Sequence, residues 1–208
     1  MNELYPLSGI VTVLNTPFSA DESIDFQAQK RNVNEAMKAG VAGFLVTVMA
    51  SEVYSLSETG RIQMVEAFRC HKIETVPSGV KYSRKPELTG GRLNVSSGWA
   101  VSRMIEGMNR GVHAFMYIYT YICRLFDAGN EEEAESLFYN MLPVLAFSNQ
   151  HLDRSIHFFK RLLYRQGIYP AILVRKNTLL FDEIHRGMAD KHIDFIIQLE
   201  NKLKSDAY

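Results

Sequence analysis

One lysine stands at the end of a short apolar segment, where an amine can act as a nucleophile. The segment reads VPSGVK at residues 76–81 and ends at Lys81. A lysine in water keeps its proton because its pKa is about 10.4, whereas an apolar environment makes the proton easier to lose. The neutral amine can then attack a carbonyl carbon and form an imine. Lys81 is therefore the first candidate for catalysis, and a structural or surface lysine is the competing interpretation.

Two apolar segments near the N-terminus have the pattern of parallel strands that are covered on both faces. They read GIVTVL at residues 9–14 and GFLVTV at residues 43–48, without polar alternation, and a helical pattern follows each of them. The first helix is predicted to begin at Ser23 or Asp25 and to end at Gly40, and Ser57 is predicted to cap the second helix. This alternation of strands and helices predicts an α/β fold.

The order and spacing of these segments resemble the first two β/α units of the dihydrodipicolinate synthase and N-acetylneuraminate lyase family. The likeness resumes after Lys81 in NVSSG at residues 94–98 and RGVHAFM at residues 110–116, which look like the family's seventh and eighth strands. The resemblance implies a (β/α)8 barrel of the TIM type. It also implies that a lysine forms an imine with the keto carbon of a pyruvate-like substrate, and Lys81 fits that lysine.

The middle of such a barrel is absent from this chain. Residues 71–75, HKIET, stand where the family carries further β/α units, including a strand with a proton-shuttling tyrosine. A complete barrel typically needs about 250 residues, and this chain has 208. We therefore expect an incomplete barrel over residues 1–129, lacking the middle units near residues 70–76, and a C-terminal helical region over residues 130–208.

The resemblance also assigns substrate-binding positions. They are Thr16, Met49, Ala50, Ser51, Gly98 and Met116. The family holds the substrate carboxylate with two small hydroxyl residues, and Met49 and Ala50 stand at those positions. Neither side chain donates a hydrogen bond, so backbone N–H groups near Ala50 and Ser51 must bind the carboxylate, or the substrate differs. The Ser51 hydroxyl is a further candidate donor, and turn and core roles explain Gly98 and Met116 equally well.

The family's catalytic tyrosine has no evident replacement. Tyr82 directly follows Lys81, so in a strand its side chain points to the opposite face. Tyr117, Tyr119 and Tyr121 share a face if the chain is extended there, although packing under a loop is the simpler interpretation. The residue that would move protons is therefore left open.

Metal and cofactor motifs are not recognisable. His151 and His157 are separated by six positions, and His185 and His192 by seven, whereas a metalloprotease helix carries its histidines at i and i+4. The GVAG segment at residues 40–43 lacks the third glycine of a dinucleotide fingerprint. We expect neither a metal nor a cofactor.

Charge and cysteine content narrow the class of partner. Lys plus Arg and Asp plus Glu are both 23, so the formal net charge is zero and nucleic acid is not an expected partner. No segment approaches the roughly 20 apolar residues of a membrane span. Cys70 and Cys123 have no metal or disulfide spacing, which favours reduced thiols and a cytoplasmic protein.

Three helices are predicted after Asn130. The first begins with Glu131, Glu132 and Glu133 at the positive end of its dipole, the second ends at Gly167, and the third covers residues 184–203. Their apolar stripes predict packing against the barrel or against a partner subunit, and we expect a homo-oligomer.

Three functions remain open from the sequence. The first is a Schiff-base-forming lyase or aldolase that acts on pyruvate or a related 2-oxo acid, as the resemblance implies. The second is a catalytically inactive, truncated relative that acts as an oligomerisation or interaction protein. The third is an inactive fragment, because removal of internal strands leaves unpaired parallel edges.

Overall fold

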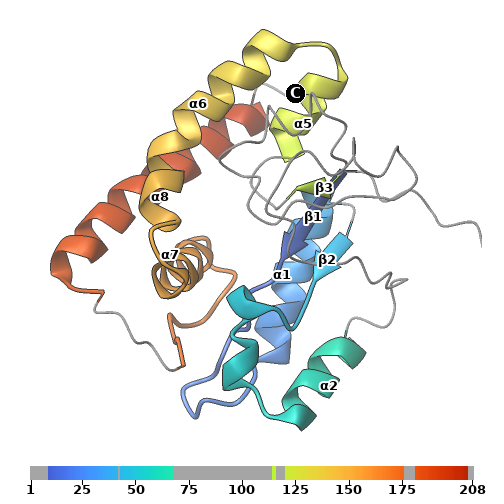
Figure 1. The fold of residues 1–208 in the computed structure, drawn as a ribbon, viewed down its shortest axis with the longest axis vertical. Helices are drawn as coiled ribbons and strands as arrows, with labels where there is room; N and C mark the ends of the chain where they lie inside the picture. The colour runs from blue at the N-terminus through green and yellow to red at the C-terminus, as the bar shows by residue number, and fades with distance from the viewer. Residues whose placement is uncertain (1–8, 42, 68–113, 116–119, 176–180, 206–208) are drawn as a thin grey trace, which may run out of the picture. The chain divides into compact units, whose positions relative to one another are not determined.

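A computed structural model describes residues 9–41, 43–67, 114–115, 120–175 and 181–205 (Figure 1). The predicted site residues Lys81, Gly98 and Met116 lie outside these ranges. The chain divides into two compact units, and each unit draws on several separate parts of the sequence. One unit comprises Met1–Leu14, Val33–Val46 and Ile62–Leu142, and the other comprises Asn15–Asn32, Thr47–Arg61 and Pro143–Tyr208. The predicted boundary between residues 129 and 130 stays a prediction.

The first unit contains a small parallel sheet. Its strands are β1 (Gly9–Val13), β2 (Gly43–Leu45) and β3 (Ala114–Phe115), in the order β2-β1-β3 (Figure 1). Val11 pairs with Gly43 on one side of β1, and Gly9 pairs with Ala114 on the other. The predicted α/β class with parallel strands is therefore confirmed.

One detail of the predicted fold differs from the structure. Strand β2 ends at Leu45 and not at Val48, because Thr47 has a φ of 55°, which is incompatible with an extended strand. The strand predicted within residues 110–116 is present as β3 beside β1. The described strands do not close into a barrel, which agrees with the expectation of an incomplete one.

Helix α1 (Phe26–Lys38) follows the loop after β1, and its ends are set by Asp25 and Gly40. The Asp25 Oδ1 accepts a hydrogen bond from the Ala28 N–H at 2.9 Å, so Asp25 rather than Ser23 caps the helix. Gly40 has a φ of +84°, and its N–H donates to the Met37 carbonyl at 2.9 Å. Both predicted ends of this helix are thereby explained.

Gly40 also leaves room for an arginine from α5 (Thr120–Asp127). The Arg124 Nη2 donates to the Ala39 carbonyl at 3.2 Å, and a Cβ on Gly40 would overlap that nitrogen. We expect Gly40→Ala to lower the free energy of unfolding by about 2–3 kcal/mol, from left-handed backbone strain plus displacement of Arg124. Denaturant unfolding measures this loss.

Gly129→Ala is the matched control for that substitution. Gly129 has a φ of +81° and no atom within 4 Å of an added Cβ, so its substitution carries the backbone strain alone. An equal loss of stability in the two variants would contradict a role for the Arg124 contact.

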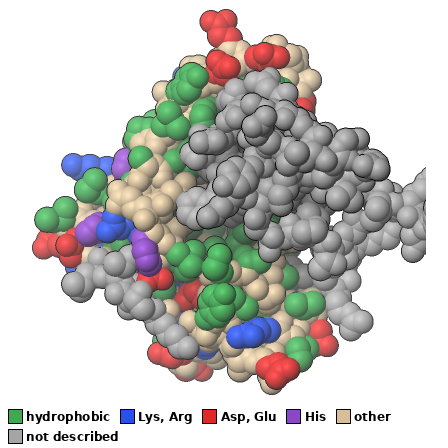
Figure 2. Space-filling view, in the orientation of Figure 1, with side chains coloured by type: hydrophobic (Ala, Val, Ile, Leu, Met, Phe, Trp, Pro, Cys, Tyr) green, Lys and Arg blue, Asp and Glu red, His purple; other side chains and the backbone are tan. Residues whose placement is uncertain are grey.

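The remaining helices agree with the sequence pattern. They are α2 (Glu58–Ala67), α6 (Glu131–Ser148), α7 (Leu152–Arg165) and α8 (Glu183–Ser205). The Ser57 Oγ caps α2 by accepting the Gly60 N–H at 3.1 Å. The three glutamates of the first turn of α6 are exposed, and Figure 2 shows acidic side chains gathered over this helix. None of the described helices is long and apolar enough to cross a membrane.

The second unit is built around α7, which packs against several other elements. Leu163 of α7 belongs to a buried cluster with Ala28, Ile168 and Tyr169. Arg161 of α7 makes a bidentate ion pair with Asp190 of α8, with both N–O distances at 2.7 Å. Helix α7 is therefore fixed on two sides, which matters because it carries a buried lysine.

Candidate functional site

A single helical turn follows β2 and brings together several of the predicted site residues. This turn, η1, consists of Met49–Ser51. The Thr16 Oγ1 donates to the Ser51 carbonyl at 2.7 Å, and the Asn15 Nδ2 donates to the Ala50 carbonyl at 2.7 Å. Thr16 is fully buried, so its hydroxyl supports the backbone of the turn from the protein interior.

The N–H groups of η1 differ in their availability. The Ser51 N–H donates to the Val48 carbonyl at 2.9 Å, so it is already used within the turn. No hydrogen bond from the Met49 or Ala50 N–H is found in the described part of the chain. The Ser51 side chain is buried, whereas Met49 is 56% exposed. The groups that remain for an anion are therefore the N–H groups of Met49 and Ala50.

The turn is bracketed by two residues in the left-handed conformation. Thr47 has a φ of 55° and Glu52 has a φ of 57°. Such a conformation costs a residue other than glycine roughly 1–3 kcal/mol and persists only where surrounding contacts enforce it. The contacts of Glu52 are therefore central to the geometry of η1.

Glu52 is buried and meets two cationic residues. Its carboxylate forms an ion pair with the Lys160 Nζ of α7, and it accepts the Arg175 backbone N–H at 2.8 Å. The side chain of Glu52 is 3% exposed and that of Lys160 is 0% exposed. The Lys160 Nζ also donates to the Leu173 carbonyl at 2.6 Å and lies 4.4 Å from the centre of the Phe18 ring.

Burial acts on both charges of this pair. It raises the pKa of the Glu52 carboxyl and, against the attraction of Glu52, lowers the pKa of Lys160 to about 8. Lys160 still holds its proton at neutral pH. Because each charge is out of water, each depends on the other for its stability.

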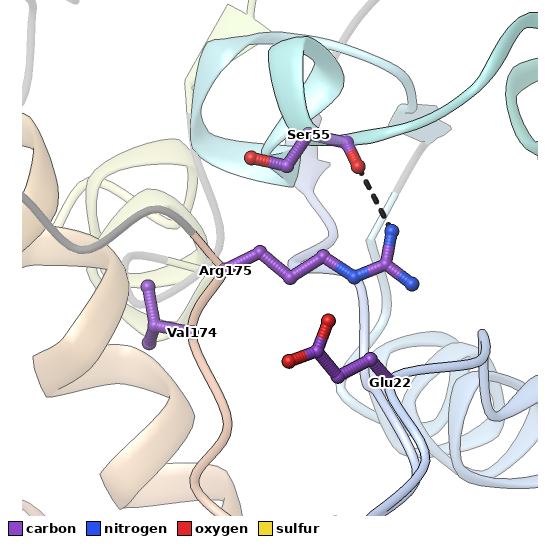
Figure 3. A pocket seen from close by; sticks show the side chains of 4 residues that line it. All are labelled: Glu22, Ser55, Val174 and Arg175. Carbon is purple, nitrogen blue, oxygen red and sulfur yellow. Dashed lines mark hydrogen bonds between the residues drawn. The ribbon is translucent and has the colours of Figure 1, made fainter.

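Arg175 extends the polar contacts to the next turn of the chain. Its guanidinium carbon lies 4.1 Å from the centre of the Phe18 ring, and its Nη1 donates to the Ser55 carbonyl at 2.8 Å. Figure 3 shows the Glu22 carboxylate pointing toward the Arg175 side chain. Glu22, Ser55, Val174 and Arg175 line an open cavity of about 300 Å³. Neither Thr16 nor any residue of η1 is among the described residues that line it.

A buried tyrosine, Tyr169, binds the backbone of Asn15, whose side chain in turn binds η1. The Tyr169 hydroxyl donates to the Asn15 carbonyl at 2.5 Å and accepts from the Asn32 Nδ2 at 3.0 Å. Burial raises the pKa of Tyr169 above its usual value, so the phenol keeps its proton. Tyr169 therefore acts here as a structural donor.

The sequence predicted only part of this arrangement. Thr16, Ala50 and Ser51 lie close together, and their role in substrate binding stays a prediction. Lys160, Arg175 and Tyr169 were not predicted. One signal was available for Lys160, which follows Ile156 and precedes Leu163 at helical spacing and therefore lies on the apolar face of α7. Among the described residues no group of histidines, cysteines or acidic residues could hold a metal ion.

His157, on the same helix, gives the unit a pH dependence. Its ring stacks on Phe181 at 4.0 Å, and burial, with a smaller contribution from Arg161, lowers its pKa from 6.5 to about 4. The folded protein then binds fewer protons than the unfolded chain between pH 4 and 6.5, so stability rises with pH across that range. The effect of this one group is at most roughly 3 kcal/mol.

We expect His157→Phe to flatten the dependence of unfolding free energy on pH between 4 and 6.5. Denaturant unfolding at several pH values measures the slope. His151→Asn is the control, because asparagine keeps an acceptor at the N-cap of α7, where His151 accepts the Asp153 N–H at 3.2 Å. An unchanged slope in His157→Phe would contradict this assignment.

Comparison with known proteins finds a family match over the N-terminal part of the chain and a wider likeness in fold. Residues 6–76 match the dihydrodipicolinate synthetase family. The structure resembles a catalytic-lysine mutant of the sialic acid aldolase from Ruminococcus gnavus, with a TM-score of 0.75 over 97% of this chain and 99% of that chain at 10% identity. The match to the dihydrodipicolinate synthetase family covers about a third of the chain, and the structural likeness covers nearly all of it.

Two synthases of this family give similar agreement. Dihydrodipicolinate synthase from Rhodopseudomonas palustris matches with a TM-score of 0.71 and 14% identity, over 92% of this chain and 99% of that chain. The enzyme from Bacteroides thetaiotaomicron matches with a TM-score of 0.68 and 16% identity, over 91% of this chain and 98% of that chain. No curated protein matches the chain. The predicted resemblance to this family is confirmed over residues 6–76, and identities this low establish the fold but not the activity.

Proposed function

We propose that this chain is a Schiff-base-forming lyase or aldolase that acts on pyruvate or a related 2-oxo acid. Lys81 is the proposed nucleophile, and the η1 turn is the proposed binding site for the substrate carboxylate. The observation that carries the second assignment is the pair of N–H groups of Met49 and Ala50, which have no hydrogen-bond partner in the described part of the chain. Backbone N–H groups can replace the missing side-chain hydroxyls because they are fixed donors to an anion.

The proposed chemistry requires an unprotonated lysine. The neutral Lys81 Nζ adds to the keto carbon, and loss of water with uptake of one proton gives a protonated imine. The positive imine nitrogen withdraws electrons, so a proton leaves the neighbouring carbon and an enamine forms. The enamine then adds to an aldehyde, or in the reverse direction it is the product of carbon–carbon cleavage.

Exchange of the pyruvate methyl protons tests this proposal without knowledge of the second substrate. In deuterium oxide, each return of the enamine to the imine places a deuteron on the methyl carbon, and proton NMR follows loss of the methyl signal. We expect exchange that is proportional to protein concentration. Exchange no faster than in heat-denatured protein would overturn the proposed function.

The second candidate function is an inactive relative that acts by association, and two observations favour it. Met49 and Ala50 replace the hydroxyl residues that the resemblance predicts, and α8 carries exposed apolar side chains on one face. Ile184, Met188 and Phe195 are 73%, 45% and 37% exposed. In this case no pyruvate exchange occurs, and light scattering shows a defined oligomer that Met188→Glu dissociates. A monomeric wild type would rule out this second candidate.

A further inference from the structure

Lys160 and Arg175 have no role in the imine chemistry itself. Both contact Glu52, the residue that directly follows the η1 turn. Glu52 directly follows Ser51 and has the left-handed conformation that lets the chain leave η1. Its carboxylate is its only long-range anchor among the contacts described above. Lys160 and the Arg175 N–H hold that carboxylate from two segments that lie more than a hundred positions later in the sequence.

We propose that Lys160, Glu52 and Arg175 form a buried clamp that fixes the η1 turn in the conformation in which the Met49 and Ala50 N–H groups can bind a substrate carboxylate. The role of the turn in binding rests on the function proposed above. Lys160 is in this view a positioning residue, because it acts through Glu52 and does not touch the substrate.

The geometry supports a clamp rather than a general contribution to stability. The Lys160 Nζ is held in a fixed position by the Leu173 carbonyl at 2.6 Å and the Phe18 ring at 4.4 Å, so it presents its charge to Glu52 in one place. The Arg175 guanidinium carbon also lies over the Phe18 ring, 4.1 Å from its centre. Arg175 in turn donates to the Ser55 carbonyl, just beyond Glu52 (Figure 3). The chain on the C-terminal side of η1 is therefore held at Glu52 and again at Ser55.

Apart from the clamp, the Ala50 and Ser51 carbonyls of η1 accept hydrogen bonds from the Asn15 and Thr16 side chains, both at 2.7 Å. With its carbonyls occupied and Glu52 anchored, the turn has little freedom to rotate its free N–H groups away from a ligand. Loss of the Lys160 charge removes the ion pair of Glu52, whereas the hydrogen bonds from Asn15 and Thr16 to η1 remain. The expected consequence is local loosening of η1, with weaker binding of a carboxylate.

Hydrogen exchange of the backbone tests the clamp directly. The Glu52 N–H is bonded to the Met49 carbonyl at 2.9 Å and the Val53 N–H to the Val48 carbonyl at 3.3 Å, so both amides report opening of η1. We expect Lys160→Met to speed exchange in peptides covering residues 48–53 by about tenfold or more. Leu163→Ala is the matched control, because it removes a buried side chain from the same helix without touching the clamp.

The pyruvate dependence of methyl exchange supplies the functional readout. Lys160→Met is expected to raise the half-saturating pyruvate concentration about tenfold and to change the maximal rate less, because the reacting lysine is intact. Glu52→Gln combined with Lys160→Met leaves no unpaired charge and is expected to fold where the single variant fails. This double variant is also expected to show faster exchange of η1 than the wild type.

The two proposals fail in different ways. Absence of methyl exchange in the wild type removes the proposed function, while hydrogen exchange still decides whether the clamp holds the turn. Equal hydrogen exchange of η1 in Lys160→Met and Leu163→Ala overturns the clamp, whatever the catalytic result.

Discussion

Lys160→Met is expected to lower the free energy of unfolding by about 3–5 kcal/mol, because it leaves the Glu52 carboxylate buried without its ion-pair partner. Lys160 has no exposed side-chain surface, and Glu52 has almost none. Methionine fills a similar volume, so the loss reports the charge rather than a cavity. Denaturant unfolding at neutral pH, where Lys160 is protonated, measures the difference.

Two variants separate this effect from the loss of any lysine. Lys191→Met removes a lysine from the exposed face of α8 and is expected to change stability by less than about 0.5 kcal/mol. Glu52→Gln combined with Lys160→Met is expected to be more stable than Lys160→Met alone, since no buried charge is left unpaired. The single variant Glu52→Gln completes a double-mutant cycle, and additive losses in that cycle would contradict the coupling of the two residues.

Lys81→Arg is expected to abolish the protein-dependent exchange of the pyruvate methyl protons, a reduction of about a hundredfold or more. Arginine keeps the positive charge and similar length, but a guanidinium is not deprotonated in proteins and forms no imine here. Proton NMR in deuterium oxide gives the rate. Lys191→Arg, the control, is expected to leave the rate unchanged, and substantial exchange by Lys81→Arg would place the nucleophile elsewhere.

The local structure was predictable where sequence signals act over short distances. Asp25, Gly40 and Ser57 mark helix ends because capping depends on one side chain or one backbone conformation. The apolar segment at residues 9–14 predicted β1 to within one residue, since a strand covered on both faces needs continuous apolar residues. The predicted end of β2 was wrong because Thr47 adopts a conformation that its residue type disfavours.

The polar contacts of the site were not predictable in the same way. The Glu52–Lys160 pair joins residues that are distant in the sequence, and no local pattern encodes which buried acid meets which buried base. A lysine on the apolar face of α7 was the one clue that such a partner exists. The resemblance to the family predicted Thr16 and the residues of η1 as binding residues, but it does not encode that the Ser51 N–H is already used within the turn.

The proposed function requires that one lysine of this chain forms an imine with a 2-oxo acid. Incubation of the purified protein with pyruvate and sodium borohydride reduces the imine to a stable secondary amine, which peptide mass spectrometry locates. We predict a single pyruvate-dependent adduct on the peptide that contains Lys81. Pyruvate-dependent modification of other lysines only, or of none, would contradict the account.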